Sequence, residues 1–262
     1  MIVNKRLYFL HIPKTGGMTV ALNFGKFLIN NKIPKYPPHA PPHDDEFNKY
    51  AFIQGHLGKY PISRTENLSI ATLVRDPIDR AVSNFIYIYD KVLKNREEYK
   101  SIPTIDGRLK YYLFEDELYF SHRNIQSKFI CSQPELNHFK DPILDEEEYR
   151  TRSKSWYLEE IQMNFDMVKL IIDDFEIVNT TLNLKVFINR LVKWFNDNYP
   201  DLPVKEIDSQ IFNINESSLN FYGTGYDTQK LKMHLSDEDI EKMLELNSLD
   251  FQLYEYVYKK ER

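Results

Sequence analysis

The sequence predicts a single α/β domain, residues 1–262, with a central parallel sheet flanked by helices. Short apolar runs typical of buried strands alternate with longer segments of helical periodicity, as in folds built from parallel strands and crossover helices. The chain has 262 residues, of which 42% are hydrophobic, which suffices for one large core. Neither an internal repeat nor a Gly/Ser-rich linker divides the chain.

Three strands are expected in the first third of the chain: residues 6–12 (RLYFLHI), 50–57 (YAFIQGHL) and 68–74 (LSIATLV). A helix is expected directly after Gly17. Its core-facing residues follow near-helical spacing: Val20, Leu22, Phe24, Phe27 and Leu28. Residues 30–48 hold five of the 13 prolines and are therefore predicted to form a surface loop.

The third strand is followed by a predicted helix start, where Asp76 suits the cap and Pro77 the first turn. Residues 91–160 are charged and mostly helical in pattern, with irregular breaks. A fourth strand is expected at 175–178, followed by a helix over 182–199 (LNLKVFINRLVKWFNDNY).

The last segment, 235–260, is predicted to form one long helix. Ser236 and Asp239 have the spacing of a capping box at its start.

Composition excludes several classes of protein. The net charge of -5 argues against a nucleic-acid binder that works by bulk electrostatics. Cys131 is the one cysteine, so no intramolecular disulfide forms, and no run approaches the roughly 20 apolar residues of a membrane span. With no signal peptide visible, we expect a cytoplasmic protein. His39 and His43 lie in the proline-rich loop without a well-spaced third ligand, so no metal is expected.

The stretch HIPKTGG, at the boundary between the first strand and its helix, predicts a phosphate cradle. Gly16 and Gly17 allow the backbone to approach an anion at a helix start, while Lys14 adds a charge and Thr15 and Thr19 add hydroxyls. The pattern is not a Walker motif, since the lysine precedes the glycines and GxxxxGK[ST] is absent from the chain. A tight turn without a ligand remains the alternative.

A second candidate anion site lies in RDPIDRAVSNF. Arg75 follows the third strand, at the edge where open α/β sheets bind ligands, and Ser83 lies eight residues further on. A guanidinium and a hydroxyl together suit a second phosphate. A capped helix start with an ion-paired arginine is the alternative.

HIPKTGGMT and RDPxxRxxSxF together resemble the phosphosulfate and 3′-phosphate motifs of sulfotransferases that use 3′-phosphoadenosine 5′-phosphosulfate (PAPS). The likeness is greatest to Golgi-type carbohydrate sulfotransferases of the uronyl and heparan 2-O group. Further segments match that family in order: QGHL (54–57), RNIQSKFIC (123–131), FEIVNTTLNLKVFINRL (175–191), NINESS (213–218) and LNSLDFQLYEY (246–256). The chain lacks the membrane anchor and lumenal disulfides of eukaryotic members, which suggests a bacterial or viral relative.

The resemblance implies a P-loop-like sulfotransferase fold and sulfuryl transfer from PAPS, with PAP as product and no metal. It implies His56 as general base and Lys14 as the cation that stabilises the leaving phosphate. It further implies that the backbone amides of residues 15–19 hold the phosphosulfate beside Lys14, although Met18 stands where many members have a hydroxyl.

The resemblance also implies that Arg75 and Ser83 bind the 3′-phosphate and that Ser217 contacts the nucleotide. The acceptor is expected to be a hydroxyl of a glycan or glycoconjugate, bound on the side of residues 91–160; neither its identity nor the oligomeric state follows from the sequence. Eight basic residues in this part suit a polyanionic glycan or simply form solvated helix faces: Lys91, Lys94, Arg96, Lys100, Arg108, Lys110, Arg123 and Lys128.

Two other functions remain open. A P-loop-like phosphotransferase such as a kinase would need a Walker lysine and an acidic Mg²⁺ ligand, where this chain has Arg75 instead. A non-catalytic relative that binds nucleotide or glycan would be expected to have lost Lys14 or His56, and both are present.

Overall fold

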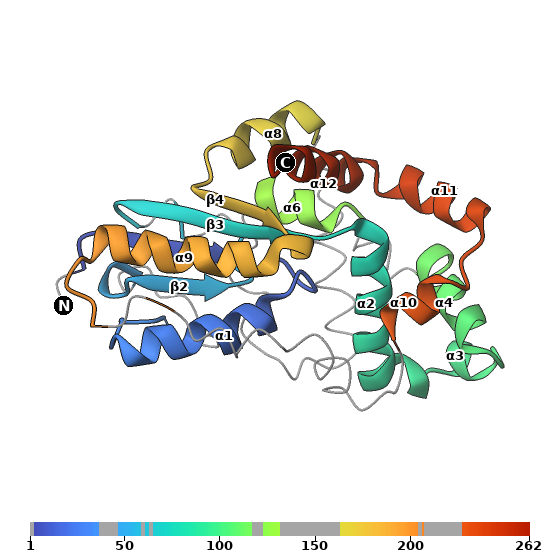
Figure 1. Ribbon diagram of the computed structural model, residues 1–262. Coiled ribbons are helices and arrows are strands. Elements are labelled where there is room, and N and C mark those ends of the chain that lie inside the picture. The colour runs from blue at the N-terminus through green and yellow to red at the C-terminus, as the bar shows by residue number, and fades with distance from the viewer. Residues whose placement is uncertain are drawn as a thin grey trace.

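The computed structural model describes residues 3–36, 47–58, 61–62, 65–116, 123–131, 163–203, 206 and 227–262. At its centre is a four-stranded, wholly parallel sheet in the order β2-β1-β3-β4 (Figure 1). The strands are β1 Arg6–Leu10, β2 Phe52–Gly55, β3 Leu68–Val74 and β4 Ile177–Thr180. The predicted α/β class with a parallel sheet is therefore confirmed.

The strand predictions hold to different degrees. β3 spans the predicted 68–74, whereas β1 and β2 are shorter than 6–12 and 50–57. The prediction of a strand at 175–178 is wrong by two residues. The N–H of Phe175 bonds to the carbonyl of Ile172 at the end of the preceding helix, so the chain is free to pair with β3 only from Ile177.

The helices surround the sheet and form a separate group at one end of it (Figure 1). Their bounds are α1 Gly17–Asn30, α2 Pro77–Lys91, α3 Glu97–Lys100, α4 Ile105–Phe114, α6 Ile125–Cys131, α8 Phe165–Asp173, α9 Leu184–Asn198, α10 Thr228–Lys232, α11 Asp237–Leu246 and α12 Ser248–Lys260. Short 3₁₀ turns are η1 Phe47–Lys49, η2 Leu93–Asn95 and η4 Thr181–Asn183. The described part of 91–160 is thus helical with breaks, as predicted.

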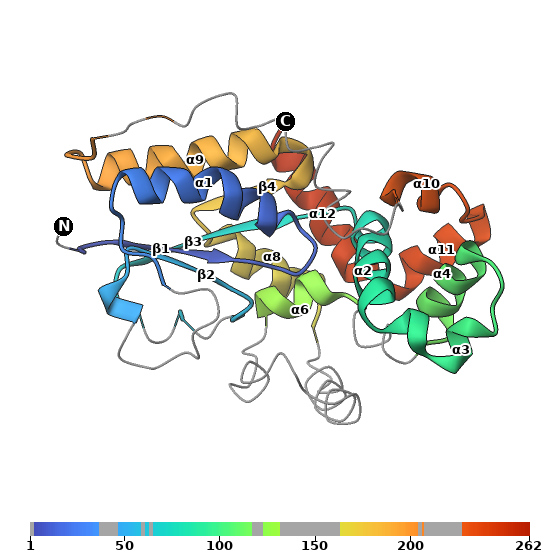
Figure 2. The ribbon, with the colours of Figure 1, turned by 90° about the horizontal axis from the view of Figure 1, so that it is seen from below.

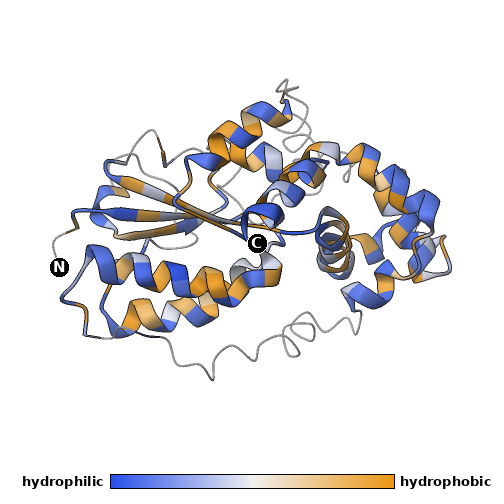
Figure 3. Ribbon diagram, turned by 45° about the horizontal axis from the view of Figure 1, so that its top comes forward, coloured by the Kyte–Doolittle hydropathy of each residue, from blue (hydrophilic) through white to orange (hydrophobic). Residues whose placement is uncertain are grey.

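The sheet is covered on both faces (Figure 2). Leu7 and Phe9 of β1 point to the face covered by α1 and α9, whereas Tyr8 and Leu10 point to the face covered by α6, α8 and α12. This period of two distributes a continuously apolar strand between two cores. Polar and apolar residues accordingly alternate along the flanking helices (Figure 3).

One residue expected on the inner face of α1 lies outside it. Leu22 is half exposed, while Val20, Phe24, Phe27 and Leu28 are buried. A third apolar cluster joins α2 to α4, α10 and α11, away from the sheet. In the described part of the chain, no helix is long and apolar enough to cross a membrane.

The predicted helix over 235–260 is wrong, because the chain divides into α11 and α12 at Asn247. The side chain of Asn124 accepts from the N–H groups of Leu249 and Asp250 at 3.1 and 3.2 Å, and so caps the start of α12. Asn247 in turn accepts from the N–H of Asn124 at 3.2 Å. This exchange between distant segments ends one helix and starts the next.

The topology itself marks one end of the sheet as a ligand site. The chain passes from β1 to β2 on one side and then to β3 on the other side of β1, so the strand order reverses at β1. In open α/β sheets, ligands bind outside the carboxyl ends of the strands at such a switch point. The turns that follow β1, β2 and β3 all lie at that edge.

Candidate active site

The turn between β1 and α1 has the backbone of an anion cradle. Lys14 and Gly16 adopt positive φ angles of 70° and 86°, and the buried Thr15 hydroxyl donates to the carbonyl of Ile12 at 2.9 Å. The first helical bond of α1 runs from Val20 N–H to Gly16 O. Within the described chain, the N–H groups of residues 17–19 have no such acceptor, and the first turn of α1 carries no acidic residue. These N–H groups are oriented for an anion.

Gly17 permits the ring of His11 to lie against the start of α1. A Cβ at Gly17 would stand 1.8 Å from His11 Nε2, far inside any allowed contact. The His11 ring stacks on Phe9, with centroids 5.7 Å apart and planes 18° apart. The glycine is therefore required here by the close approach of a side chain.

His56, which follows β2, meets His11 at the same edge. Its Nδ1 lies 2.5 Å from the carbonyl oxygen of His11, and the two ring centroids are 4.3 Å apart. Because a carbonyl only accepts, Nδ1 carries the proton and Nε2 is the nitrogen that can take up another one. This tautomer is the one required of a general base that acts through Nε2.

Arg75 connects the two predicted anion sites. Its guanidinium donates to the carbonyl of Lys14 at 3.1 Å, which brings the β3–α2 turn against the cradle (Figure 2). The backbone of Arg75 is held by the side-chain amide of Gln126, which accepts from its N–H at 2.8 Å and donates to its carbonyl at 2.9 Å. The predicted cap is confirmed as well, since Asp76 accepts from Asp79 N–H and Pro77 begins α2.

Ser83 lies half-buried on α2, and the described residues give its hydroxyl no hydrogen-bond partner. At the cradle, Met18 is exposed, and the carbonyl of Thr19 accepts from Asn23. Ser217 falls outside the described residues, as do His39 and His43. The structure thus brings together the predicted residues Lys14–Thr19, His56 and Arg75, with Ser83 on the adjoining helix.

Burial and like charges shift the pKa values at this edge. Burial, followed by the neighbouring charges of Arg75, Lys91 and Arg80, lowers the pKa of Lys14 to about 8. Burial also lowers the pKa of Arg75, partly offset by Asp79 and Asp76. Desolvation and the nearby His56 hold the pKa of His11 well below its usual value, so His11 is neutral at pH 7. Cations gathered at one edge of the sheet, despite the cost of burial and mutual repulsion, are typical of a site for an anionic ligand.

A second network supports Arg75 from the end of the chain. The buried carboxylate of Asp250 accepts from Gln126 N–H at 3.1 Å and from both the N–H and the hydroxyl of Ser127 at 2.8 Å. Asp250 thus fixes the start of α6, and Gln126 in that turn fixes Arg75. The segments RNIQSKFIC and LNSLDFQLYEY, noted separately in the sequence, form one unit in the structure.

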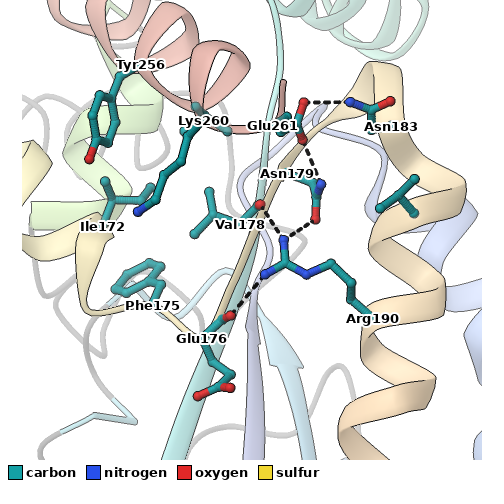
Figure 4. Close-up of a pocket in the computed structure, with 12 residues that line it drawn as sticks. Ile172, Phe175, Glu176, Val178, Asn179, Asn183, Arg190, Tyr256, Lys260 and Glu261 are labelled. Atoms are coloured by element: carbon teal, nitrogen blue, oxygen red, sulfur yellow. Dashed lines mark hydrogen bonds between the residues drawn. The ribbon is translucent and has the colours of Figure 1, made fainter.

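A pocket of about 470 Å³ lies elsewhere, along the outer edge of β4 between α9 and α12 (Figure 4). Arg190 donates to Val178 O, Asn179 Oδ1 and Glu176 O, while Glu261 accepts from Asn179, Thr180 and Asn183. Arg190 and Glu261 thus hydrogen-bond to backbone groups of the edge strand β4. Their side chains shield this edge of the sheet from pairing with another strand. The pocket contains none of the predicted site residues.

Four of the eight basic residues named in the 91–128 region form ion pairs in the described part of the chain. Lys94 pairs with Asp90, Arg96 with Asp116, Lys100 with Glu97 and Lys110 with Asp239. At these four positions the ion pairs favour the interpretation as solvated helix faces over that of a basic groove for a polyanionic glycan. The described residues contain no group of three metal-ligating side chains.

Residue patterns alone did not identify three side chains at the site: the ring of His11, Gln126, and Tyr87 of α2, whose ring centroid lies 4.7 Å from Lys14 Nζ. His11 begins the HIPKTGG stretch and Gln126 lies within RNIQSKFIC, so both were inside noted segments without a role. Tyr87 lies one helical turn after Ser83, and this spacing is the pattern that would have placed it on the same side of α2 as the predicted site residue.

Comparison with known proteins agrees with this geometry. The model of the sulfotransferase family matches residues 2–257, nearly the whole chain. No curated protein matched the chain. The match includes the cradle, His56, Arg75 and the Asn124–Asp250 unit. The chain therefore belongs to the sulfotransferase family.

Proposed function

We propose that this protein transfers a sulfuryl group from PAPS to a hydroxyl of a carbohydrate acceptor. Family membership supports sulfuryl transfer in general and a hydroxyl-bearing acceptor. The observation that carries the more specific proposal is the convergence of Lys14, Arg75 and His56 at the switch point, with Arg75 3.1 Å from the carbonyl of Lys14.

The residues at this edge suit a nucleotide with two separate anionic groups. The N–H groups of residues 17–19 and the ammonium of Lys14 suit the 5′-phosphosulfate. Arg75 and Ser83 suit the 3′-phosphate, which distinguishes PAPS from ATP and ADP. Ser217 is proposed as a further nucleotide contact on the family resemblance alone.

PAPS supplies an activated sulfuryl group. In the proposed reaction the acceptor oxygen forms a bond to sulfur while the bond between sulfur and the bridging oxygen of the donor breaks. His56 Nε2 takes the proton of the acceptor hydroxyl, with Nδ1–H held on the carbonyl of His11. Lys14 neutralises the negative charge that develops on the bridging oxygen. No step requires a metal.

The nucleotide part of the proposal is tested by thermal unfolding with PAP, 5′-ADP or ATP–Mg²⁺. A ligand at 100 times its dissociation constant adds about 2.7 kcal/mol of stability. For a chain of this size that corresponds to a melting shift of roughly 5–10 °C. We expect the shift with PAP and its loss in Arg75→Ala. A shift with ATP–Mg²⁺ alone would indicate a phosphotransferase, and no shift at all would favour a non-catalytic relative.

The catalytic part is tested with labelled PAPS and a panel of glycan acceptors. We expect His56→Ala to abolish transfer while PAP still raises the melting temperature. His234→Ala serves as control, since His234 is exposed beyond α10 and lies between Leu231 and Leu235 of the apolar cluster away from the sheet. Turnover in His56→Ala close to that of the wild type would remove His56 from the role of base.

A further inference from the structure

Helix α2 presents a row of side chains to the cradle, and the proposed reaction uses only the first of them. Ser83, Tyr87 and Lys91 follow one another at intervals of four residues, which places them on one side of the helix. Ser83 has a proposed role at the 3′-phosphate. Tyr87 and Lys91 have none.

The ring of Tyr87 lies close to two ammonium groups. Lys14 Nζ is 4.7 Å from the ring centroid and Lys91 Nζ is 4.2 Å from it. Both distances fall within the roughly 6 Å over which an aromatic face attracts a cation. Lys91 also donates a hydrogen bond to the Tyr87 hydroxyl at 2.8 Å, which holds the ring in place.

The charges around Lys14 show why its position needs support. Arg75 from the β3–α2 turn and Arg80 and Lys91 from α2 are all cations that act on Lys14, and the neighbouring His11 is neutral. The two acids at the start of α2, the cap Asp76 and Asp79, pair with Lys232. Four like charges repel one another, and a lysine side chain has many rotamers. An aromatic face beside the ammonium favours one of these positions.

We propose that Tyr87 is a positioning residue that holds the ammonium of Lys14 at the cradle, and that Lys91 fixes Tyr87 and sets the charge environment of Lys14. The inference rests on the proposed function in one respect, since it takes Lys14 to act on the leaving phosphate. The stacking geometry and the coupling between the two lysines are independent of that role.

Turnover of Tyr87→Leu and Tyr87→Phe tests the positioning role. A cation–π contact of ordinary strength corresponds to roughly 3- to 30-fold in rate if it acts in the transition state. We expect Tyr87→Leu to lose kcat by this factor with a smaller change in KM for PAPS, and Tyr87→Phe, which keeps the ring, to recover most of it. Equal turnover in Tyr87→Leu and wild type, or an equal loss in both variants, would overturn the role of the ring.

A second measurement does not require activity. The pH dependence of Lys14 acylation, followed by mass spectrometry, reports the pKa of Lys14. Lys91→Met removes a like charge, so the titration of Lys14 should move to higher pH. Lys94→Met is the matched control, because Lys94 pairs with Asp90 and is not among the charges that act on Lys14. An unchanged titration in Lys91→Met, or an equal shift in Lys94→Met, would overturn the coupling.

The two measurements separate this inference from the proposed function. If the wild type transfers no sulfuryl group and binds no PAP but Lys91→Met shifts the titration of Lys14, the proposed function fails and the coupling stands. If the wild type is active and neither Tyr87→Leu nor Lys91→Met has the expected effect, the inference fails and the function stands.

Discussion

Substituting Gly17 by alanine tests the tightest contact of the site. An ideal Cβ there would lie 1.8 Å from His11 Nε2 and 2.2 Å from two ring carbons, whereas real Cβ contacts are not shorter than 3.0 Å. The ring must therefore move by at least 1.2 Å, the difference between 3.0 and 1.8 Å. The ring centroids of Phe9 and His56 lie 5.7 and 4.3 Å from that of His11. Movement of the His11 ring is therefore expected to displace His56 as well.

The expected change in the stability of Gly17→Ala follows from two opposed effects. Overpacking of this kind costs about 1–3 kcal/mol, while alanine gains up to about 1 kcal/mol over glycine in a helix. The net loss in the free energy of unfolding therefore lies between about 0 and 3 kcal/mol, or a melting temperature lower by up to roughly 12 °C. Activity should fall further, by about 100-fold, because a shift of about 1 Å at a catalytic group has that effect. Urea unfolding measures the loss of stability, and transfer of labelled sulfate measures the loss of activity.

The variant His11→Ala provides the control. Removing the ring leaves space for the new methyl group, so the double variant should be no less stable than His11→Ala alone. Gly16→Ala should behave differently. Its Cβ has room, with the nearest atom at 3.7 Å, but φ of 86° costs about 1–2 kcal/mol whether or not His11 is present. If the effect of Gly17→Ala simply adds to that of His11→Ala, the packing argument is refuted.

Three further predictions concern the same edge of the sheet. Since the pKa of Lys14 is about 8, kcat/KM should fall above roughly that pH as the ammonium deprotonates, and a profile flat to pH 10 would contradict the role of Lys14. Gln126→Leu leaves two backbone groups of Arg75 unpaired, so urea unfolding should show a loss of about 1–3 kcal/mol and calorimetry weaker PAP binding; unchanged PAP affinity would exclude this support. The buried His11 binds a proton less readily than in the unfolded chain, so stability should decline as the pH falls below 6.5, and the decline should be smaller in His11→Phe; parallel pH profiles of the two would contradict this.

Local patterns predicted much of the framework. The continuous apolar run of β3 and the Asp76–Pro77 helix start depend on neighbouring residues, and both were found as predicted. The capping box of Ser236 and Asp239 was found for the same reason. The backbone of the β1–α1 turn also depends on local residues, because Gly16 permits the positive φ of 86° that the turn adopts.

Features that depend on distant residues were missed. The helix over 235–260 divides because Asn124, more than 100 residues earlier, caps its second half. Leu22 fits the helical pattern of α1 yet is half exposed, since the contacts of α9 decide which side of α1 is covered. Gln126 resembles any polar helical residue until β3 is placed beside it. Such contacts follow from the tertiary structure and leave no periodic trace in the sequence.

The support of Arg75 by α6 and α12 has a consequence for biosynthesis. Arg75 is synthesised 175 residues before Asp250, the residue that fixes the turn containing Gln126. At ordinary rates of translation this interval is roughly 9–35 s. For all but its first sixteen residues the nascent chain already contains the cradle, His56 and α2, but not the carboxylate that completes their support. Competence to bind nucleotide is therefore expected to arise late, when α12 leaves the ribosome and docks, rather than when the binding residues themselves emerge.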